Sequence, residues 1–274
     1  MEVVGAIKGR QFSRRIASER AFVGVSVLLF TASAVLTIVW CASMSTMGAM
    51  TMPGCWTMSM TWMRMPGKTW LGAAASFVGM WAVMMVAMML PSVVSMLWRY
   101  RQVVAKTDKA RLGGLTALVA IAYFFVWTLF GMIAFPLGAA LAAVEMQLPP
   151  LAHAVPLAVG IVVVIAGVLQ FTAWKAHHLA CCRQTPGHGH ALPADTGTAW
   201  RHGLLHGVHC SFCCVGLMAI LLVIGVMDLR AMAAVAVAIA VERLAPAGER
   251  VARAIGAVVL VTGLFLIARA TGLA

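Results

Sequence analysis

The stretch LGAAASFVGMWAVMMVAMMLPSVVSML, from Leu71 to Leu97, contains no charged residue. A helix crosses the hydrocarbon core of a bilayer with about 20 apolar residues, so this stretch is long enough to span a membrane. Comparable runs occur at about 21–41, 113–143, 153–174, 204–227 and 254–270, with a shorter one at about 229–241. The sequence therefore predicts an all-α protein, a polytopic transmembrane bundle of about seven spans.

The composition supports a membrane protein, because 62% of the residues are hydrophobic, 10% are charged and the mean hydropathy is +0.96. A net charge of +12 would favour nucleic-acid binding in a soluble domain. Here the Lys and Arg residues lie mostly in a basic head, 1–20, and in the loops 98–112, 175–202 and 242–253. We therefore expect no nucleic-acid partner. The positive-inside rule places these four segments in the cytoplasm, with residues 21–274 as one transmembrane domain in the lipid bilayer.

Histidine and cysteine are concentrated in one part of the chain. Seven of the eight histidines and five of the seven cysteines fall between His177 and Cys214. Positions four residues apart share one face of a helix, so His206, Cys210 and Cys214 lie in one row. Thiolate, imidazole and thioether ligands suit Cu(I) or Zn(II) better than oxygen-seeking metals. The predicted ligands are His178, Cys182, His206, His209, Cys210, Cys213 and Cys214.

Methionine is concentrated in two other places. The Met-rich loop 42–70, expected outside the cell, holds eight methionines, and thioether is a good ligand for Cu(I). In the following span, Met80, Met84 and Met88 repeat every four residues. This stripe either passes Cu(I) inward by ligand exchange or serves as packing surface, since Met commonly fills cores.

Four further residues have two interpretations each. Cys41 and Cys55 lie at the outer side, where they form either a disulfide or a pair of copper ligands. Asp228 and Glu242 flank the short run at 229–241. Charged groups near bilayer depth either pair with neighbouring cations or serve function, here as a carboxylate ligand or proton acceptor.

Four motifs stand out along the chain: 80–92, Trp174-Lys175 through Cys182-Arg183, the Cys210-x-x-Cys213-Cys214 element and Glu242-Arg243. With these motifs the chain resembles, over roughly residues 70–250, a bacterial family of predicted metal-binding integral membrane proteins. The resemblance implies a polytopic bundle with a metal site in the bacterial inner membrane. The chain departs from the family pattern at three positions: it has His178 where the family has Cys, Asp228 where the family has Asn, and Val215 where the family has Trp. The Met stripe is also similar in its chemistry to Ctr-type copper transporters.

The sequence thus favours a protein that handles copper, with zinc as the alternative metal. Its role would be copper transport or delivery to a cuproenzyme, with a membrane or periplasmic protein as partner. Two competitors remain, a membrane-bound metal-dependent oxidoreductase and a structural or assembly subunit of a metalloenzyme complex. We favour a role without catalysis, because clustered thiolates oxidise readily at an oxygen-activating centre.

Overall fold

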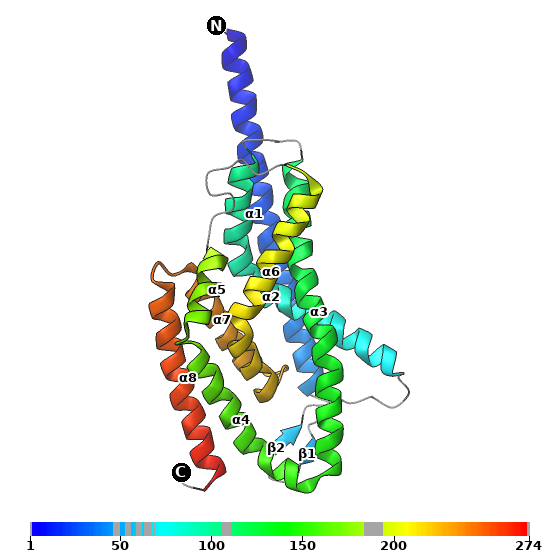
Figure 1. Ribbon diagram of the computed structural model, residues 1–274. Coiled ribbons are helices and arrows are strands. Elements are labelled where there is room, and N and C mark those ends of the chain that lie inside the picture. The colour runs from blue at the N-terminus through cyan, green and yellow to red at the C-terminus, as the bar shows by residue number, and fades with distance from the viewer. Residues whose placement is uncertain are drawn as a thin grey trace.

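The computed structural model describes residues 2–45, 50–52, 56–58, 62, 67, 69–105, 111–183 and 194–272. Within these residues the chain forms eight α-helices and one short β-hairpin (Figure 1). The helices are α1 (Glu2–Ser45), α2 (Trp70–Val104), α3 (Leu112–Gln147), α4 (Pro149–Leu169), α5 (Ala173–Arg183), α6 (Thr196–Ile224), α7 (Leu229–Leu244) and α8 (Gly248–Ala270). The strands β1 (Met50–Met52) and β2 (Trp56–Met58) pair antiparallel within the predicted Met-rich loop.

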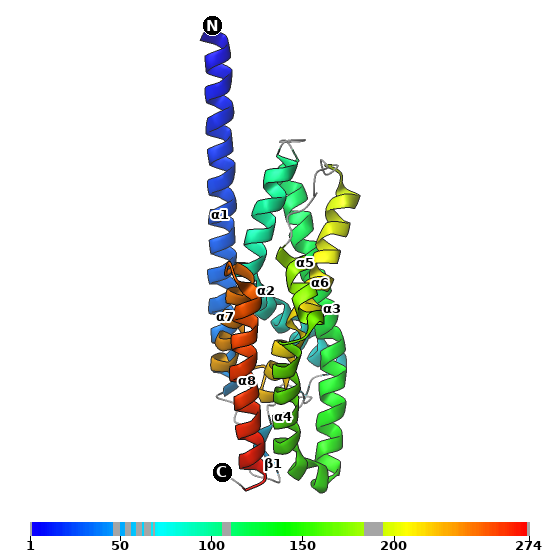
Figure 2. The same ribbon diagram turned by 60° about the vertical axis from the view of Figure 1, so that its left-hand side comes forward.

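Six of the described helices are long and apolar enough to cross a membrane: Ile16–Met44 of α1, α2, α3, Pro150–Leu169 of α4, α6 and α8. The predicted helical bundle is therefore confirmed. The expected span at 229–241 corresponds to α7, which has 16 residues and is not among the six. At 1.5 Å per residue such a helix is about 24 Å long, short of a hydrocarbon core about 30 Å thick. Figures 1 and 2 place the start of α1 and the end of α8 at opposite ends of the bundle.

The segment 175–202, expected to be a loop, is helical at both ends. Residues 173–183 form α5, and α6 begins at Thr196 after Asp195, whose side chain accepts a hydrogen bond from the Thr198 amide. The expectation was wrong here because Ala, Leu, Lys and Arg favour helix around the histidines and cysteines, and Asp is a strong N-cap. Residues 184–193, with the predicted His188-x-His190 pair, lie outside the described residues.

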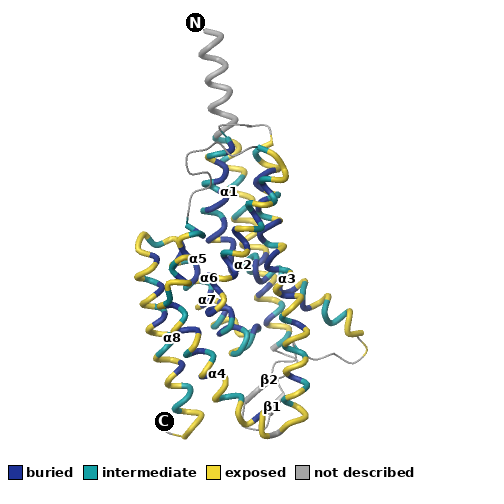
Figure 3. The backbone as a smooth tube through the Cα atoms, viewed as in Figure 1, coloured by how far each residue is buried: buried dark blue, intermediate teal, exposed yellow. Residues whose placement is uncertain are grey.

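The buried part of the bundle centres on α2 and α6, whereas α1 and α8 expose most of their apolar side chains (Figure 3). Glycines set two close helix contacts. A side-chain carbon at Gly203 of α6 would lie 2.4 Å from the Val119 carbonyl oxygen of α3, and one at Gly167 of α4 would lie 2.9 Å from the Leu260 nitrogen of α8. Small residues let helix backbones approach in this way. The helices α5, α6 and α7 contact one another at the level where α4 ends and α8 begins (Figure 1).

Candidate metal centre

Four cysteines from two helices form one buried group, which we call the thiol cluster: Cys182 of α5 with Cys210, Cys213 and Cys214 of α6. The Cys182 thiol interacts with that of Cys213, and the Cys214 thiol interacts with those of Cys210 and Cys213. The interaction with Cys213, followed by burial, holds the pKa of the Cys182 thiol well above its usual range. The fold thus joins the Cys210-x-x-Cys213-Cys214 element to a cysteine 28 or more positions away in the chain.

Two side chains outside the thiol cluster contact its sulfurs. Arg243 at the end of α7 is buried, and its Nη2 donates to the sulfurs of Cys182 (3.5 Å) and Cys214 (3.6 Å). The hydroxyl of Tyr123 on α3 lies 2.7 Å from the sulfur of Cys210. A guanidinium stays positively charged in proteins, so it favours thiolate over thiol in the cysteines it contacts. The cluster therefore places four soft sulfur donors beside one fixed cation, which partly opposes the rise in the thiol pKa.

A buried ion pair lies next to the thiol cluster. Lys175 of α5 donates to Glu242 Oε2 of α7 at 2.7 Å and to the Cys213 carbonyl oxygen of α6 at 2.8 Å. Both charged side chains are almost fully buried. Burial raises the pKa of the Glu242 carboxyl above its usual range, although the Lys175 ammonium opposes this effect. Lys175 therefore fixes α5 to α6 and α7 at the cysteines.

The predicted histidine ligands do not join the thiols directly. His178 of α5 and His209 of α6 form a separate pair, with 3.2 Å between their Nδ1 atoms. Partial burial lowers the pKa of His178, and the neighbouring imidazoles of His209 and His177 lower it further. A neutral imidazole has one ring nitrogen without a proton, and this nitrogen can bind a metal. His206 is buried one helical turn before Cys210, with its ring 5.9 Å from that of Tyr123. The structure thus divides the predicted set into a thiol cluster, an imidazole pair and His206.

The methionine stripe faces the core of the bundle. Met80, Met84 and Met88 are all buried on α2, and Met218 is buried on α6, four residues beyond Cys214. Their burial agrees equally with packing and with a soft-ligand path. In the Met-rich segment 42–70 the strands β1 and β2 carry three of the eight methionines, and Met47, Met60, Met63 and Met65 lie outside the described residues.

The two flanking carboxylates have different surroundings. Asp228 is exposed and caps α7, because its Oδ1 accepts from the amides of Arg230 (2.8 Å) and Ala231 (3.0 Å). Glu242 pairs with Lys175, not with its sequence neighbour Arg243. At the other end of the bundle Cys41 is a free cysteine, its sulfur 3.7 Å from that of Met227, and Cys55 lies outside the described residues.

Among the residues that the structure describes, no three His, Cys, Asp or Glu side chains are grouped so as to hold a metal ion as they stand. The donor chemistry of the thiol cluster nevertheless fits a soft cation, because all four of its cysteines are buried and each offers a sulfur atom as a ligand.

Sequence reasoning did not assign Tyr123, Lys175 or Arg243 to the site. Lys175 and Arg243 themselves belong to the motifs Trp174-Lys175 and Glu242-Arg243 on which the family resemblance rests, and this was the signal that was available. Tyr123 carries no such signal, because it lies in an apolar span and reaches Cys210 only through the packing of α3 on α6.

Comparison with known proteins gives one match. The sequence profile of the PpoB2 family, described as a copper chaperone, matches residues 78–266. This range contains the methionine stripe, the thiol cluster, both histidine groups and the Lys175–Glu242 pair. No curated protein and no solved structure matches the chain.

Proposed function

The chain belongs to the PpoB2 copper chaperone family, since the match covers well over half of its length, and from this premise we propose that it binds Cu(I) within the membrane and delivers it to a copper enzyme. The observation that carries the proposal is the thiol cluster, in which α5 and α6 bring four sulfurs together beside Arg243. Copper is the cargo of such a protein, so the site must both hold the ion and release it.

The contacts around the sulfurs support Cu(I) as the cargo. A Cu(I) ion held by two thiolates carries a net charge of −1, and an unpaired charge in a buried site is costly. Arg243 contacts two of the sulfurs and supplies the balancing positive charge. Ion binding replaces the interactions among the thiols of Cys182, Cys213 and Cys214, and it releases protons because thiol ligands bind as thiolates.

The imidazole pair supports a route for release. His178 belongs to the same short helix as Cys182, and His209 lies one position before Cys210, so both flank the thiol cluster. Both rings are only partly buried, unlike the cysteines. We place the transfer to a protein partner at this pair. The methionine stripe of α2, starting at Met80, would supply Cu(I) from the outer side of an inner-membrane protein with a cytoplasmic N-terminus.

Copper binding is tested with purified protein in detergent, loaded with Cu(I) and analysed for metal content by mass spectrometry. The test variant replaces all four cysteines of the thiol cluster by Ser. Cys181→Ser is the matched control, because Cys181 adjoins Cys182 but contacts His177 on the outer side of α5. Copper retained by the wild type and the control, and lost from the fourfold variant, supports the proposal. Equal copper in the fourfold variant, or retention of zinc alone, contradicts it.

Delivery is separated from transport with sealed proteoliposomes given external Cu(I). We expect the copper to stay bound to the protein and to move to an added apo-cuproenzyme, with no accumulation of copper in the vesicle lumen. Protein with His178→Ala and His209→Ala should still bind copper but transfer it more slowly. Accumulation in the lumen that depends on the thiol cluster would instead identify a transporter.

A further inference from the structure

A pocket on the outside of the bundle lies opposite the thiol cluster, across Lys175. It has a volume of about 280 Å³ and is formed by the connection between α4 and α5, by α5 and by the first turns of α8. Its polar lining comes from Gln170, Lys175, Glu249 and Arg253. This volume equals that of roughly nine water molecules in the liquid, at about 30 Å³ each. The pocket is therefore large enough for a small polar headgroup.

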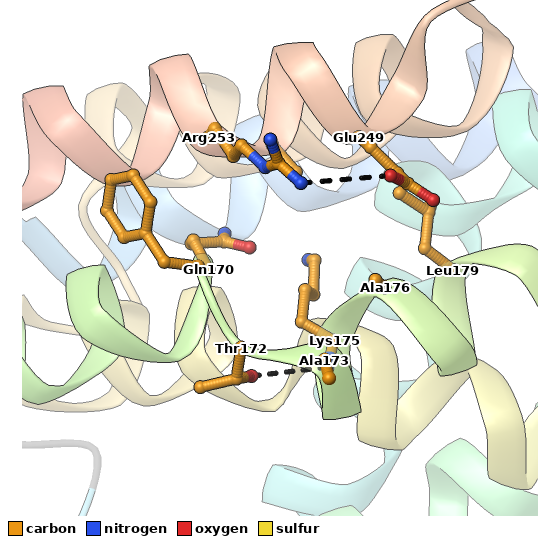
Figure 4. Close-up of a pocket in the computed structure, with 10 residues that line it drawn as sticks. Gln170, Thr172, Ala173, Lys175, Ala176, Leu179, Glu249 and Arg253 are labelled. Carbon is orange, nitrogen blue, oxygen red and sulfur yellow. Dashed lines mark hydrogen bonds and ion pairs between the residues drawn. The ribbon is translucent and has the colours of Figure 1, made fainter.

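One buried group in this pocket lacks a partner. Gln170 is 5% exposed, and within the described part of the chain neither its amide nitrogen nor its amide oxygen makes a hydrogen bond. An unsatisfied buried amide is costly, so each native example calls for an explanation. Figure 4 shows Gln170 and Lys175 directed into the same space, which Glu249 and Arg253 border from α8. The amide presents both a donor and an acceptor to whatever occupies the pocket.

The charges of the pocket are of both signs. The Lys175 ammonium uses two of its three N–H groups on Glu242 and the Cys213 carbonyl, which leaves one for a ligand. Arg253 adds a second cation at the mouth, and the Glu249 carboxylate lies 4.0 Å from it. Because the Arg253–Glu249 contact is long and exposed, it holds neither group strongly. Lys175, Arg253 and the Gln170 nitrogen suit a phosphate, whereas Glu249 and the Gln170 oxygen suit a primary ammonium.

The surface beyond the pocket is apolar. Ile165 and Val168 of α4 and Val258 and Val261 of α8 are each about half or more exposed. The two helices run side by side away from α5 (Figures 1 and 2), and Phe171, which lines the pocket, is itself about half exposed, so apolar surface begins at the pocket and extends over this pair of helices. Exposed apolar surface of this kind is what acyl chains cover in a bilayer.

We propose that this pocket binds the phosphoethanolamine headgroup of a phospholipid, with the acyl chains lying on the exposed face of α4 and α8. The bound headgroup satisfies Gln170 and lies directly against Lys175, the residue that fixes α5 to α6 and α7. A lipid in this position would hold α5 in place, and with it Cys182 and His178. The proposal does not depend on copper, and its test contains no metal.

The test is native mass spectrometry of the full chain in detergent, with phosphatidylethanolamine, phosphatidylcholine and phosphatidylglycerol added in equal amounts. We expect the ethanolamine lipid to stay bound in preference to the other two. Gln170→Ala should reduce its retention roughly tenfold, since a hydrogen bond to a charged group is lost. This variant removes an unsatisfied group, so it should fold, which its thermal unfolding midpoint verifies. Arg269→Ala, an exposed cation at the far end of α8, is the matched control and should bind like the wild type.

Three results would overturn the proposal. The first is equal retention of the ethanolamine lipid by Gln170→Ala and the wild type. The second is equal binding of the choline lipid, whose quaternary ammonium has no N–H to donate to Gln170 or Glu249. The third is displacement of the lipid by soluble O-phosphoethanolamine at equal concentration, which would make the free headgroup compound the ligand in place of a lipid.

Discussion

Replacement of Lys175 by Met should strongly destabilise the protein. The change removes the ammonium that bonds to Glu242 at 2.7 Å and to the Cys213 carbonyl at 2.8 Å, and it leaves a carboxylate that is 1% exposed without a partner. Removing one partner of a buried ion pair costs about 3–5 kcal/mol. At about 2–4 °C per kcal/mol for a chain of this size, the midpoint of thermal unfolding should fall by roughly 6–20 °C.

The assay is thermal unfolding of the detergent-solubilised protein, followed by circular dichroism. The double variant Lys175→Met/Glu242→Met removes both charges, so it should be more stable than Lys175→Met alone. Glu249→Gln is the control, because it breaks an ion pair that is 60% or more exposed and should change stability by less than about 1 kcal/mol. If the separately measured costs of Lys175→Met and Glu242→Met add in the double variant, or if Glu249→Gln costs as much as Lys175→Met, the buried pair does not hold α5 in place.

Three further results are expected. Gly203→Ala should cost about 1–3 kcal/mol by forcing α6 away from the Val119 carbonyl, whereas Gly79→Ala on α2 meets no atom within 4 Å and should be neutral or stabilising; equal midpoints for the two variants would contradict this. Tyr123→Phe removes the contact to Cys210 and should change the affinity for Cu(I) a few-fold, since a hydrogen bond contributes about 0.5–1.5 kcal/mol. Competition with a Cu(I) chelator measures this affinity, and an unchanged value would show that Tyr123 does not contribute to copper binding. Hydrogen bonds from Thr198 lower the pKa of Asp195. The N-cap of α6 therefore stabilises the helix fully above the ordinary carboxyl pKa, and this stability is lost as the pH falls through the lowered value. The protection factors of amides at the start of α6, taken relative to intrinsic exchange at the same pH, should fall in acid, but not in Asp195→Asn.

The helices could be predicted from the sequence because each is a long apolar run, and length in a bilayer leaves little choice of structure. The expected row of His206, Cys210 and Cys214 lies on the buried side of α6, as helical spacing requires. The prediction of a loop at 175–202 was wrong because α5 is a short helix and α6 begins several residues before its apolar run, and such segments are set by capping and packing more than by hydrophobic period.

The sequence by itself determined the kind of helices, their order and the soft donor atoms that they carry. Spacing along one helix is fixed by its geometry, so neighbours such as Cys210 and Cys214 follow from the sequence alone. Only the tertiary structure decided that Cys182 and Arg243 join them, that Lys175 pairs with Glu242, and that His178 pairs with His209 instead of the thiols. These contacts join different helices, and they depend on how closely the packed helices approach one another. That distance is a property of the packed bundle and not of any single helix.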